Sequence, residues 1–242
     1  MKRIGAIFLL VLAAGTGAAI AGDAAELKIL GFSRDGRYFA FEQSGATDAG
    51  TFSRITTMDV GANRPRKGSS FSYREEKPSR VTSRVKRIRA AASRLIRRLR
   101  ISQKGFMTVS IRGIQFEPFE EASRKSLALP SNWFGPETWL VLHQFKMAQR
   151  CKNTDTNPIG FALTLERKDA RPIQLTHDMT IPASRGCPTH YRIAEAHARR
   201  LKDGSNALAV IVENFAPEFE GKNGGFSAVT ALIPSVNTTR PQ

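Results

Sequence analysis

The stretch LKILGFSRDGRYFAFE, residues 27–42, predicts a β-hairpin at the start of the folded chain. Apolar side chains recur mostly at alternate positions in both halves of the stretch, which is the pattern of strands. The turn Ser33-Arg34-Asp35-Gly36 separates the halves, and Asp-Gly is a strong hairpin signal because glycine accepts a positive φ without a Cβ clash. The rest of the chain must therefore supply a sheet or a helix that covers these two strands.

The composition bounds the class of protein. The chain has 242 residues, of which 41% are hydrophobic, and this is enough for one large β-rich domain or two small ones with a buried core. Its aromatic residues are 15 Phe, 3 Tyr and 2 Trp, which favours packing over stacking on nucleic-acid bases. The formal charge of +16 predicts an anionic partner, such as nucleic acid, lipid head groups or an acidic protein.

The first residues of the chain predict export, and export narrows the choice of anionic partner. The basic segment Met1-Lys2-Arg3 precedes the apolar run IGAIFLLVLAA, and Ala19-Ile20-Ala21 fits the small-x-small cleavage pattern. We interpret residues 1–21 as a secretory signal peptide; the alternative is a retained membrane anchor, for which the run is short. No later segment has the ~20 apolar residues of a membrane span. A periplasmic or secreted location follows, and nucleic acid is then not an expected partner.

The predicted organisation is a single secreted domain over 22–235, followed by a flexible tail at 236–242. Within the domain we expect an N-terminal hairpin region at 22–60, a basic helix at 74–104 and a C-terminal sheet region at 137–235. These segments predict an α+β, β-rich fold with antiparallel strands and one long basic helix.

Strand signals recur after the hairpin. FSRITTMDV at 52–60 is rich in β-branched residues, FMTVSIR at 106–112 alternates, and the polar segment 61–73 between them predicts a loop. Further strands are predicted at 138–147, 160–168, 171–175, 190–197, 208–215 and 225–233. Two segments are ambiguous: EEASRKSLAL at 120–129 could form helical turns, and 191–202 could be a helix because it contains strong helix formers.

The hairpin also resembles one blade of a β-propeller, in which a Phe-Ser-x-Asp-Gly-x-Tyr-x-Ala-Phe strand pair recurs. The matching residues are Phe32, Ser33, Asp35, Gly36, Tyr38, Ala40 and Phe41. The chain holds no second copy, and a propeller needs several blades, so we take the resemblance as local hairpin chemistry.

A basic amphipathic helix is predicted between Arg74 and Lys104. Apolar residues recur there at steps of three and four: Val81, Val85, Ile88, Ala92, Leu95 and Leu99. Basic residues fill the positions between them: Arg80, Arg84, Lys86, Arg87, Arg89, Arg94, Arg97, Arg98 and Arg100. Two interpretations compete. The helix binds a membrane surface or an acidic partner through arginines such as Arg87, Arg94 and Arg98, or it packs by its apolar stripe and leaves a solvated arginine face.

The two cysteines, Cys151 and Cys187, predict a disulfide, because an even count in an oxidising compartment favours pairing. The bond would close a loop of about 36 residues and contribute roughly 3–4 kcal/mol on the chain-entropy model. Two buried thiols or a redox pair are the alternatives, although the chain has no Cys-x-x-Cys motif.

The densest unusual sequence is IPASRGCPTHYR at 181–192, where two prolines and a glycine restrict the backbone. Arg185 and Arg192 could clamp a carboxylate or a phosphate, and Glu218 and Glu220 could pair with them. The alternative is a rigid loop whose arginines cap backbone carbonyls.

The sequence contains no Gly-x-Gly-x-x-Gly, no phosphate loop, no Gly-x-Ser-x-Gly and no His-Glu-x-x-His. A metal site built from His177-Asp178 and Cys187 to His190 is disfavoured, since a disulfide-bonded cysteine is not a thiolate ligand. The other histidines are His143 and His197. A catalytic set of Ser184, His177 and Asp178 is also disfavoured, because adjacent strand residues point to opposite faces. We therefore predict no catalytic residue, no metal and no cofactor.

Three motifs in combination resemble a known family. They are FSRDGRYFAFE at 32–42, IPASRGCP at 181–188 and FEG at 219–221, and they look like a family of bacterial predicted secreted proteins with a domain of unknown function. The resemblance covers nearly all of the chain after the signal segment. It implies export and brings no known activity, so no catalytic residue carries over. The arginine-rich helix is more basic here than the resemblance implies.

The sequence therefore predicts an exported, non-enzymatic binding or interaction module of the bacterial envelope. The basic helix, the export signal and the missing catalytic motifs favour this function, and the expected partner is an envelope protein or an anionic surface. The alternative is a hydrolase with a site near Ser184 to Arg192, and a third interpretation is a small-ligand binder that uses Arg185.

Overall fold

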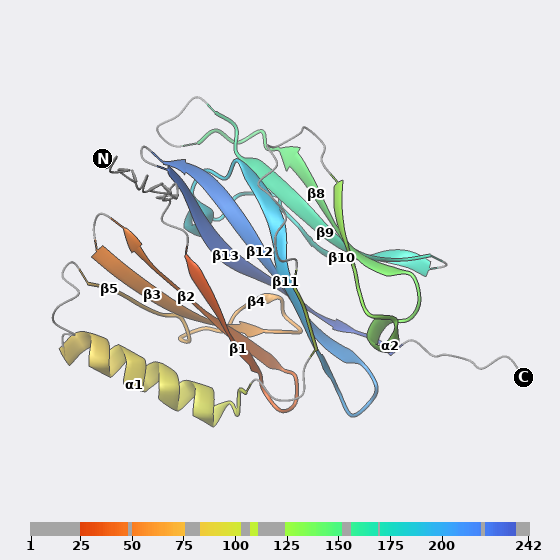
Figure 1. Ribbon diagram of the computed structural model, residues 1–242, viewed down its shortest axis with the longest axis horizontal. Helices are drawn as coiled ribbons and strands as arrows, with labels where there is room; N and C mark the ends of the chain where they lie inside the picture. The colour runs from red at the N-terminus through yellow and green to blue at the C-terminus, as the bar shows by residue number, and fades with distance from the viewer. Residues whose placement is uncertain are drawn as a thin grey trace, which may run out of the picture.

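Three antiparallel sheets are stacked so that a central sheet lies between two outer ones (Figure 1). The computed structural model describes residues 25–47, 50–75, 83–102, 107–110, 124–151, 156–168, 170–218 and 221–235. The predicted signal peptide and the predicted C-terminal tail lie outside these residues. Within them, no helix is both long enough and apolar enough to cross a membrane.

The strand bounds define the three sheets. The N-terminal sheet has the order β1 (Glu26–Phe32), β2 (Tyr38–Thr47), β3 (Gly50–Asp59) and β4 (Arg64–Pro65), and β5 (Phe71–Glu75) also pairs with β3. The central sheet has the order β13 (Gly221–Ile233), β12 (Asn206–Glu218), β11 (His190–Arg200) and β6 (Met107–Ser110). The β7–β10 sheet has the order β10 (Ala170–His177), β9 (Ile159–Arg167), β8 (Thr138–Lys146) and β7 (Arg124–Ala128). The helices are α1 (Ser83–Arg98) and α2 (Ser131–Phe134), and a 3-10 turn spans Ala183–Arg185.

The predicted N-terminal hairpin is confirmed, because β1 and β2 pair antiparallel. Ser33 stabilises its turn: the hydroxyl donates to Asp35 Oδ1 over 2.6 Å, and Oγ accepts the Tyr38 N–H over 2.9 Å. Gly36 has φ +71°, and a Cβ there would lie 2.3 Å from Leu201 Cδ2. The backbone conformation therefore favours glycine, and a larger residue would also have to displace the Leu201 side chain of the β11–β12 turn.

Strand β12 is the centre of the stack. Its run ALAVIV at 207–212 is apolar without alternation because both faces of the strand are buried. Ala207, Ala209 and Ile211 face the N-terminal sheet, whereas Leu208, Val210 and Val212 face the β7–β10 sheet. The central sheet therefore contributes to two separate cores.

Each core is filled mainly by large apolar side chains of an outer sheet. On the N-terminal side these are Phe32, Phe39, Phe41, Met58 and Val60. On the other side they include Leu140, Leu142, Phe161, Leu163 and Leu165. Full burial of one such side chain contributes about 1.5–3 kcal/mol, so the two interfaces supply the main driving force for the fold.

The helix predicted at 74–104 is wrong in its extent, and a long helix is not confirmed. Arg74 and Glu75 belong to β5, which pairs with β3, and α1 has 16 residues. Val85 and Ala92 are the buried residues of α1, and the helix lies along the N-terminal sheet beside β5 (Figure 1). The residues between β5 and α1 lie outside the described part of the chain.

Other local predictions need correction. Residues 124–128 form β7 rather than helical turns, and 191–200 extend as β11 rather than as a helix. The expected loop at 61–73 contains β4 and the start of β5. The likeness to a propeller blade is not confirmed, because β1, β2 and β3 belong to a five-stranded sheet.

Candidate functional site

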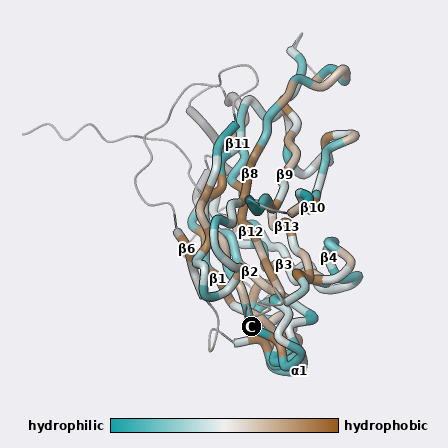
Figure 2. Tube along the Cα trace, turned by 90° about the vertical axis from the view of Figure 1, so that its right-hand side faces the viewer, coloured by the Kyte–Doolittle hydropathy of each residue, from teal (hydrophilic) through white to brown (hydrophobic). Residues whose placement is uncertain are grey.

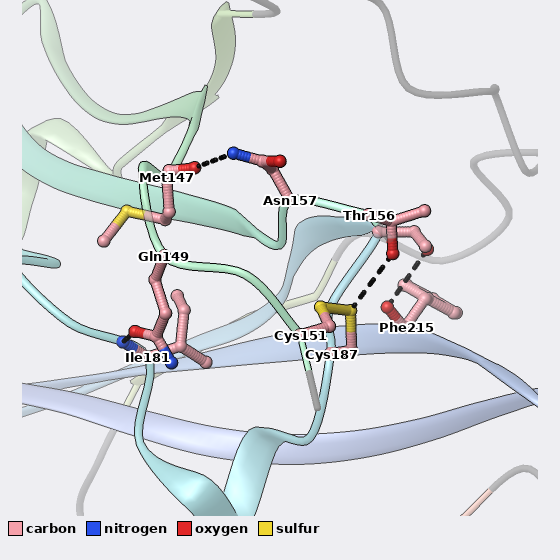
Figure 3. Close-up of a disulfide and its surroundings, with 9 residues drawn as sticks. Met147, Gln149, Cys151, Thr156, Asn157, Ile181, Cys187 and Phe215 are labelled. Atoms are coloured by element: carbon pink, nitrogen blue, oxygen red, sulfur yellow. Dashed lines mark hydrogen bonds between the residues drawn. A yellow bond between two sulfur atoms is a disulfide. The ribbon is translucent and has the colours of Figure 1, made fainter. Parts of the chain in front are cut away.

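The disulfide between Cys151 and Cys187 is confirmed, with the two Cα atoms 5.6 Å apart. It joins the chain after β8 to the loop that precedes β11, and Figure 3 shows further contacts around it. The Ile181 N–H donates to Gln149 Oε1 over 3.4 Å, and Asn157 Nδ2 donates to the Met147 carbonyl over 2.7 Å. The disulfide and the Ile181–Gln149 hydrogen bond tie the segment 181–192 to the chain that follows β8.

Arg185 lies inside this segment and is largely buried. Its Nη1 lies 2.7 Å from Asp178 Oδ2 and 3.5 Å from the Tyr191 hydroxyl, and the guanidinium stacks 4.8 Å from the Phe161 ring centroid. The Asp178 carboxylate also accepts the Phe161 N–H over 3.0 Å. Burial raises the pKa of Tyr191 to about 12, with a smaller opposing effect of the Arg185 charge. The guanidinium therefore holds the loop against β9, and 13% of the Arg185 side chain is exposed.

Arg192 lies on β11 and pairs through Nε with Glu213 on the neighbouring strand β12. The guanidinium also stacks 5.5 Å from the Phe215 ring centroid. Arg185 and Arg192 thus have separate carboxylate partners, Asp178 and Glu213. The side chains of Glu218 and Glu220, the partners considered from the sequence, lie outside the described residues.

Ser184 lines a cleft of about 580 Å³ whose other walls come mainly from the N-terminal sheet and β13, with Thr176 of β10. All of the residues that line this cleft are described, and none of them is His, Asp, Glu, Lys or Cys. His177 stacks instead on Phe145, with 5.0 Å between ring centroids, and Asp178 is bound to Arg185. Among the described residues, no group of three or more His, Cys, Asp or Glu side chains could hold a metal ion.

The arginines of α1 are on the outside of the molecule. The helix has seven basic and no acidic residues, and Arg87, Arg94 and Arg98 are all exposed. Their spacing of seven and four places them on one face. Arg89 is different, because its Nε donates to the Tyr73 hydroxyl of β5 over 3.0 Å and fixes the helix to the sheet.

A basic pocket of about 820 Å³ lies where three chain reversals meet. The β1–β2 turn and the start of β2 supply Arg34, Asp35 and Tyr38. The end of α1 supplies Arg98, Leu99 and Arg100. The end of β11 and the turn after it supply Arg199, Arg200, Leu201, Lys202 and Asp203. Six cationic side chains thus face two carboxylates. Of the residues proposed from the sequence, only Arg98 is in this pocket.

Both carboxylates of the pocket have neutral partners of their own. The Ser33 hydroxyl donates to Asp35 and lowers the pKa of that carboxyl, and the Ser205 hydroxyl does the same for Asp203. Both side chains therefore stay ionised at neutral pH. Neither forms an ion pair with an arginine of the pocket in the described structure.

Two of the arginines are fixed by backbone carbonyls. Arg199 Nε donates to the Arg34 carbonyl over 3.2 Å, and Arg200 Nη2 donates to the Asn132 carbonyl over 2.7 Å. In contrast, the exposed side chains of Arg34, Arg98, Arg100 and Lys202 have no hydrogen-bond or ion-pair partner among the described residues. The pocket therefore presents four cations that are available to a ligand.

The backbone of Arg100 has an unusual conformation. Its φ is +52°, and it ends α1 in a left-handed residue, with the Ile101 N–H bonded to the Ile96 carbonyl over 3.0 Å. Glycine is the usual residue at this position of a helix end, since any Cβ is strained there. Arginine thus stands at the pocket at the expense of backbone strain.

Sequence reasoning missed most of this pocket. In the sequence, Arg34 is part of a predicted turn, and Arg199, Arg200 and Lys202 fall in or beside a segment that is ambiguous between strand and helix. The available signal was the sequence RRLKDG at 199–204, a basic run that ends in a turn. No local sequence pattern indicates that this turn lies beside Arg34 and the end of α1.

No curated protein and no solved structure matches the chain. The family model of predicted secreted proteins with a domain of unknown function, DUF2259, matches residues 40–231. This range contains β3 to β12 and nearly all of the described structure, including the disulfide and two of the three segments that form the pocket. The chain therefore belongs to this family of secreted proteins, as its three motifs predicted.

Proposed function

We propose that this secreted protein is a non-enzymatic module of the bacterial envelope that binds an anionic, phosphate-bearing lipid surface. The contact surface consists of the basic pocket and the exposed arginine face of α1, with Arg98 shared by both. The observation that carries the proposal is the convergence of six cationic side chains from three separate segments of the chain on one pocket. A periplasmic location fits this proposal, because the surfaces that face the periplasm carry phosphate groups.

A simpler explanation accounts for part of the charge. Arg97 and Arg98 lie in the last turn of α1, where cations interact favourably with the helix dipole. That effect does not extend to Arg34 or Lys202, which come from other elements. It also does not explain why a strained arginine stands at position 100 instead of glycine.

The hydrolase alternative near Ser184 to Arg192 has less support. A serine nucleophile needs a base within hydrogen-bond reach. The described lining of the cleft beside Ser184 offers no such base, and its two arginines are Arg54 and Arg185. Binding is therefore the function that the geometry favours.

The proposal is tested by sedimentation of the exported chain with vesicles that contain phosphatidylglycerol or only phosphatidylcholine. The variant R87E/R94E/R98E should bind the anionic vesicles at least about 100-fold more weakly, since each lost cation near such a surface removes about 1 kcal/mol and each introduced carboxylate adds repulsion. The matched control is R64E/K67E/R171E, which changes the net charge equally at exposed positions outside the pocket. Equal loss in both variants, or no loss in the first, would contradict the proposal.

A further inference from the structure

The outer edge of β13 is a second candidate binding site, because some of its backbone groups can accept a partner strand. β13 is an edge strand of the central sheet, and it lies between β10 and β3 (Figure 2). The β12–β13 register runs from Asn206 to Glu218 without a shift. In such a ladder, every second residue of the edge strand points its N–H and C=O away from the sheet.

Two side-chain amides identify which residues these are. The Phe226 N–H donates to Gln43 Oε1 over 3.1 Å, and the Thr230 N–H donates to Asn63 Oδ1 over 2.7 Å. Asn63 has φ +47° and also donates from Nδ2 to the Leu175 carbonyl of β10 over 3.1 Å. The two amides therefore close the edge at both ends of a window about 14 Å long.

Ala228 lies midway between these two positions and points its backbone groups to the same side. It is half-buried, and its outward N–H and C=O have no hydrogen-bond partner within the described part of the chain. An N–H and a C=O on one residue form the pair that an incoming extended chain uses when it joins a sheet edge. The edge of β13 is thus covered at both ends of this window and open at Ala228 in its middle.

The cleft of about 580 Å³ lies on this window. Its volume is in the usual range of ligand pockets, roughly 300–1,000 Å³. Buried Phe41 and Met58 form part of its apolar wall, and hydroxyl side chains such as Ser72 and Ser184 line its polar part. Apolar walls with adjacent hydroxyls suit the alternating side chains of an extended peptide.

The charged residues that line the cleft indicate which peptides it would bind. The lining residues, all of them described, include no acidic side chain, and the only charged ones are Arg54 and Arg185. Arg185 is held by Asp178, whereas exposed Arg54 has no ion pair among the described residues. A carboxylate, either from an acidic side chain or from a free C-terminus, is the complementary group.

We propose that this cleft binds an extended peptide segment of a partner protein, which pairs its backbone with Ala228 and a carboxylate with Arg54. The peptide adds a short strand to the open edge of the central sheet. This inference does not depend on the anion-binding pocket, which lies at another set of turns.

The first test uses the exported chain and a synthetic library of short, proline-free peptides, half with a free C-terminal carboxylate and half amidated. For peptides that bind, hydrogen exchange of the Ala228 amide should slow at least about tenfold, as expected when a free amide becomes hydrogen-bonded. Soluble glycan fragments are tested in parallel. Binding of glycans without peptides, or no peptide bound below about 1 mM, overturns the inference.

Two variants locate the contact. A228P removes the outward N–H and keeps the β12–β13 ladder, because proline is tolerated at such edge positions, and it should weaken peptide binding at least about tenfold. R54A should weaken binding of carboxylate peptides about tenfold, while R64A, a change at another exposed arginine outside the cleft, should change nothing. Unchanged binding in both A228P and R54A overturns the inference, and if A228P does not fold, the exchange measurement and R54A decide.

Discussion

The substitution R100G should stabilise the protein and weaken its binding to anionic lipid at the same time. Arg100 is exposed, its φ is +52°, and no partner of its side chain is present among the described residues. A left-handed conformation costs an L-residue roughly 1–2 kcal/mol, and glycine removes that cost. The larger entropy of glycine in the unfolded chain offsets about 0.5–1 kcal/mol of the gain.

The expected net change is therefore an increase of about 0.5–1 kcal/mol in the free energy of unfolding. For a chain of this size, that raises the Tm by about 1–4 °C. The loss of one cation near the lipid surface should weaken vesicle binding about fivefold. Thermal unfolding and vesicle sedimentation measure the two effects on the same preparation.

R100A separates strain from charge, because alanine removes the guanidinium and keeps the Cβ. It should lose the same vesicle affinity as R100G and gain no stability. Should R100G prove less stable than the wild type, or R100A gain as much as R100G, the assignment of strain to this residue is incorrect. If either variant binds vesicles as tightly as the wild type, Arg100 does not belong to the binding surface.

Three further predictions concern the interior and the loop. Reduction of the Cys151–Cys187 disulfide should lower the free energy of unfolding by roughly 3–4 kcal/mol, measured as the urea midpoint with and without dithiothreitol, and an unchanged midpoint would contradict the role of the bond. D178A should cost about 3–5 kcal/mol because it leaves the buried charge of Arg185 unpaired, and the double variant D178A/R185M should recover part of that loss; equal stability of both variants would exclude this cause. Burial lowers the pKa of His197 to about 4 although its Nε2 lies 2.9 Å from Glu195 Oε2, so the imidazole stays neutral in the native state, while in the unfolded chain it binds a proton below about pH 6.5. The free energy of unfolding should therefore fall by about 3 kcal/mol from pH 6.5 to pH 4, and H197L should flatten this part of the stability–pH profile. If the profiles of the wild type and H197L run parallel, His197 is not the cause of the fall.

The parts of the fold that follow from local chemistry could be predicted from the sequence. The Asp-Gly turn predicted the first hairpin, and alternation placed most later strands within a few residues. The helix at 74–104 was extended too far because Arg74 and Glu75 gain more by pairing with β3 than by helix formation. Alanine-rich β11 was ambiguous because its strand conformation depends on packing between two other sheets.

The candidate site was less predictable, for a physical reason. Arg98 was proposed from a helical pattern, but its neighbours Arg34 and Lys202 reach it only through the tertiary meeting of two distant turns. The run ALAVIV at 207–212 does indicate a strand buried on both faces, and this was the available signal for a central sheet. Which residues surround that sheet depends on strand order, and no local pattern specifies strand order.

The most direct test of the anion-binding proposal is an NMR titration of the exported chain with a short-chain phosphatidylglycerol, observed at the arginine side-chain Nε–H groups. The account predicts that the signals of Arg34, Arg98 and Arg100 shift together and saturate, while those of Arg54 and Arg171 stay in place. Shifts spread evenly over all exposed arginines, or absent from these three, would contradict it.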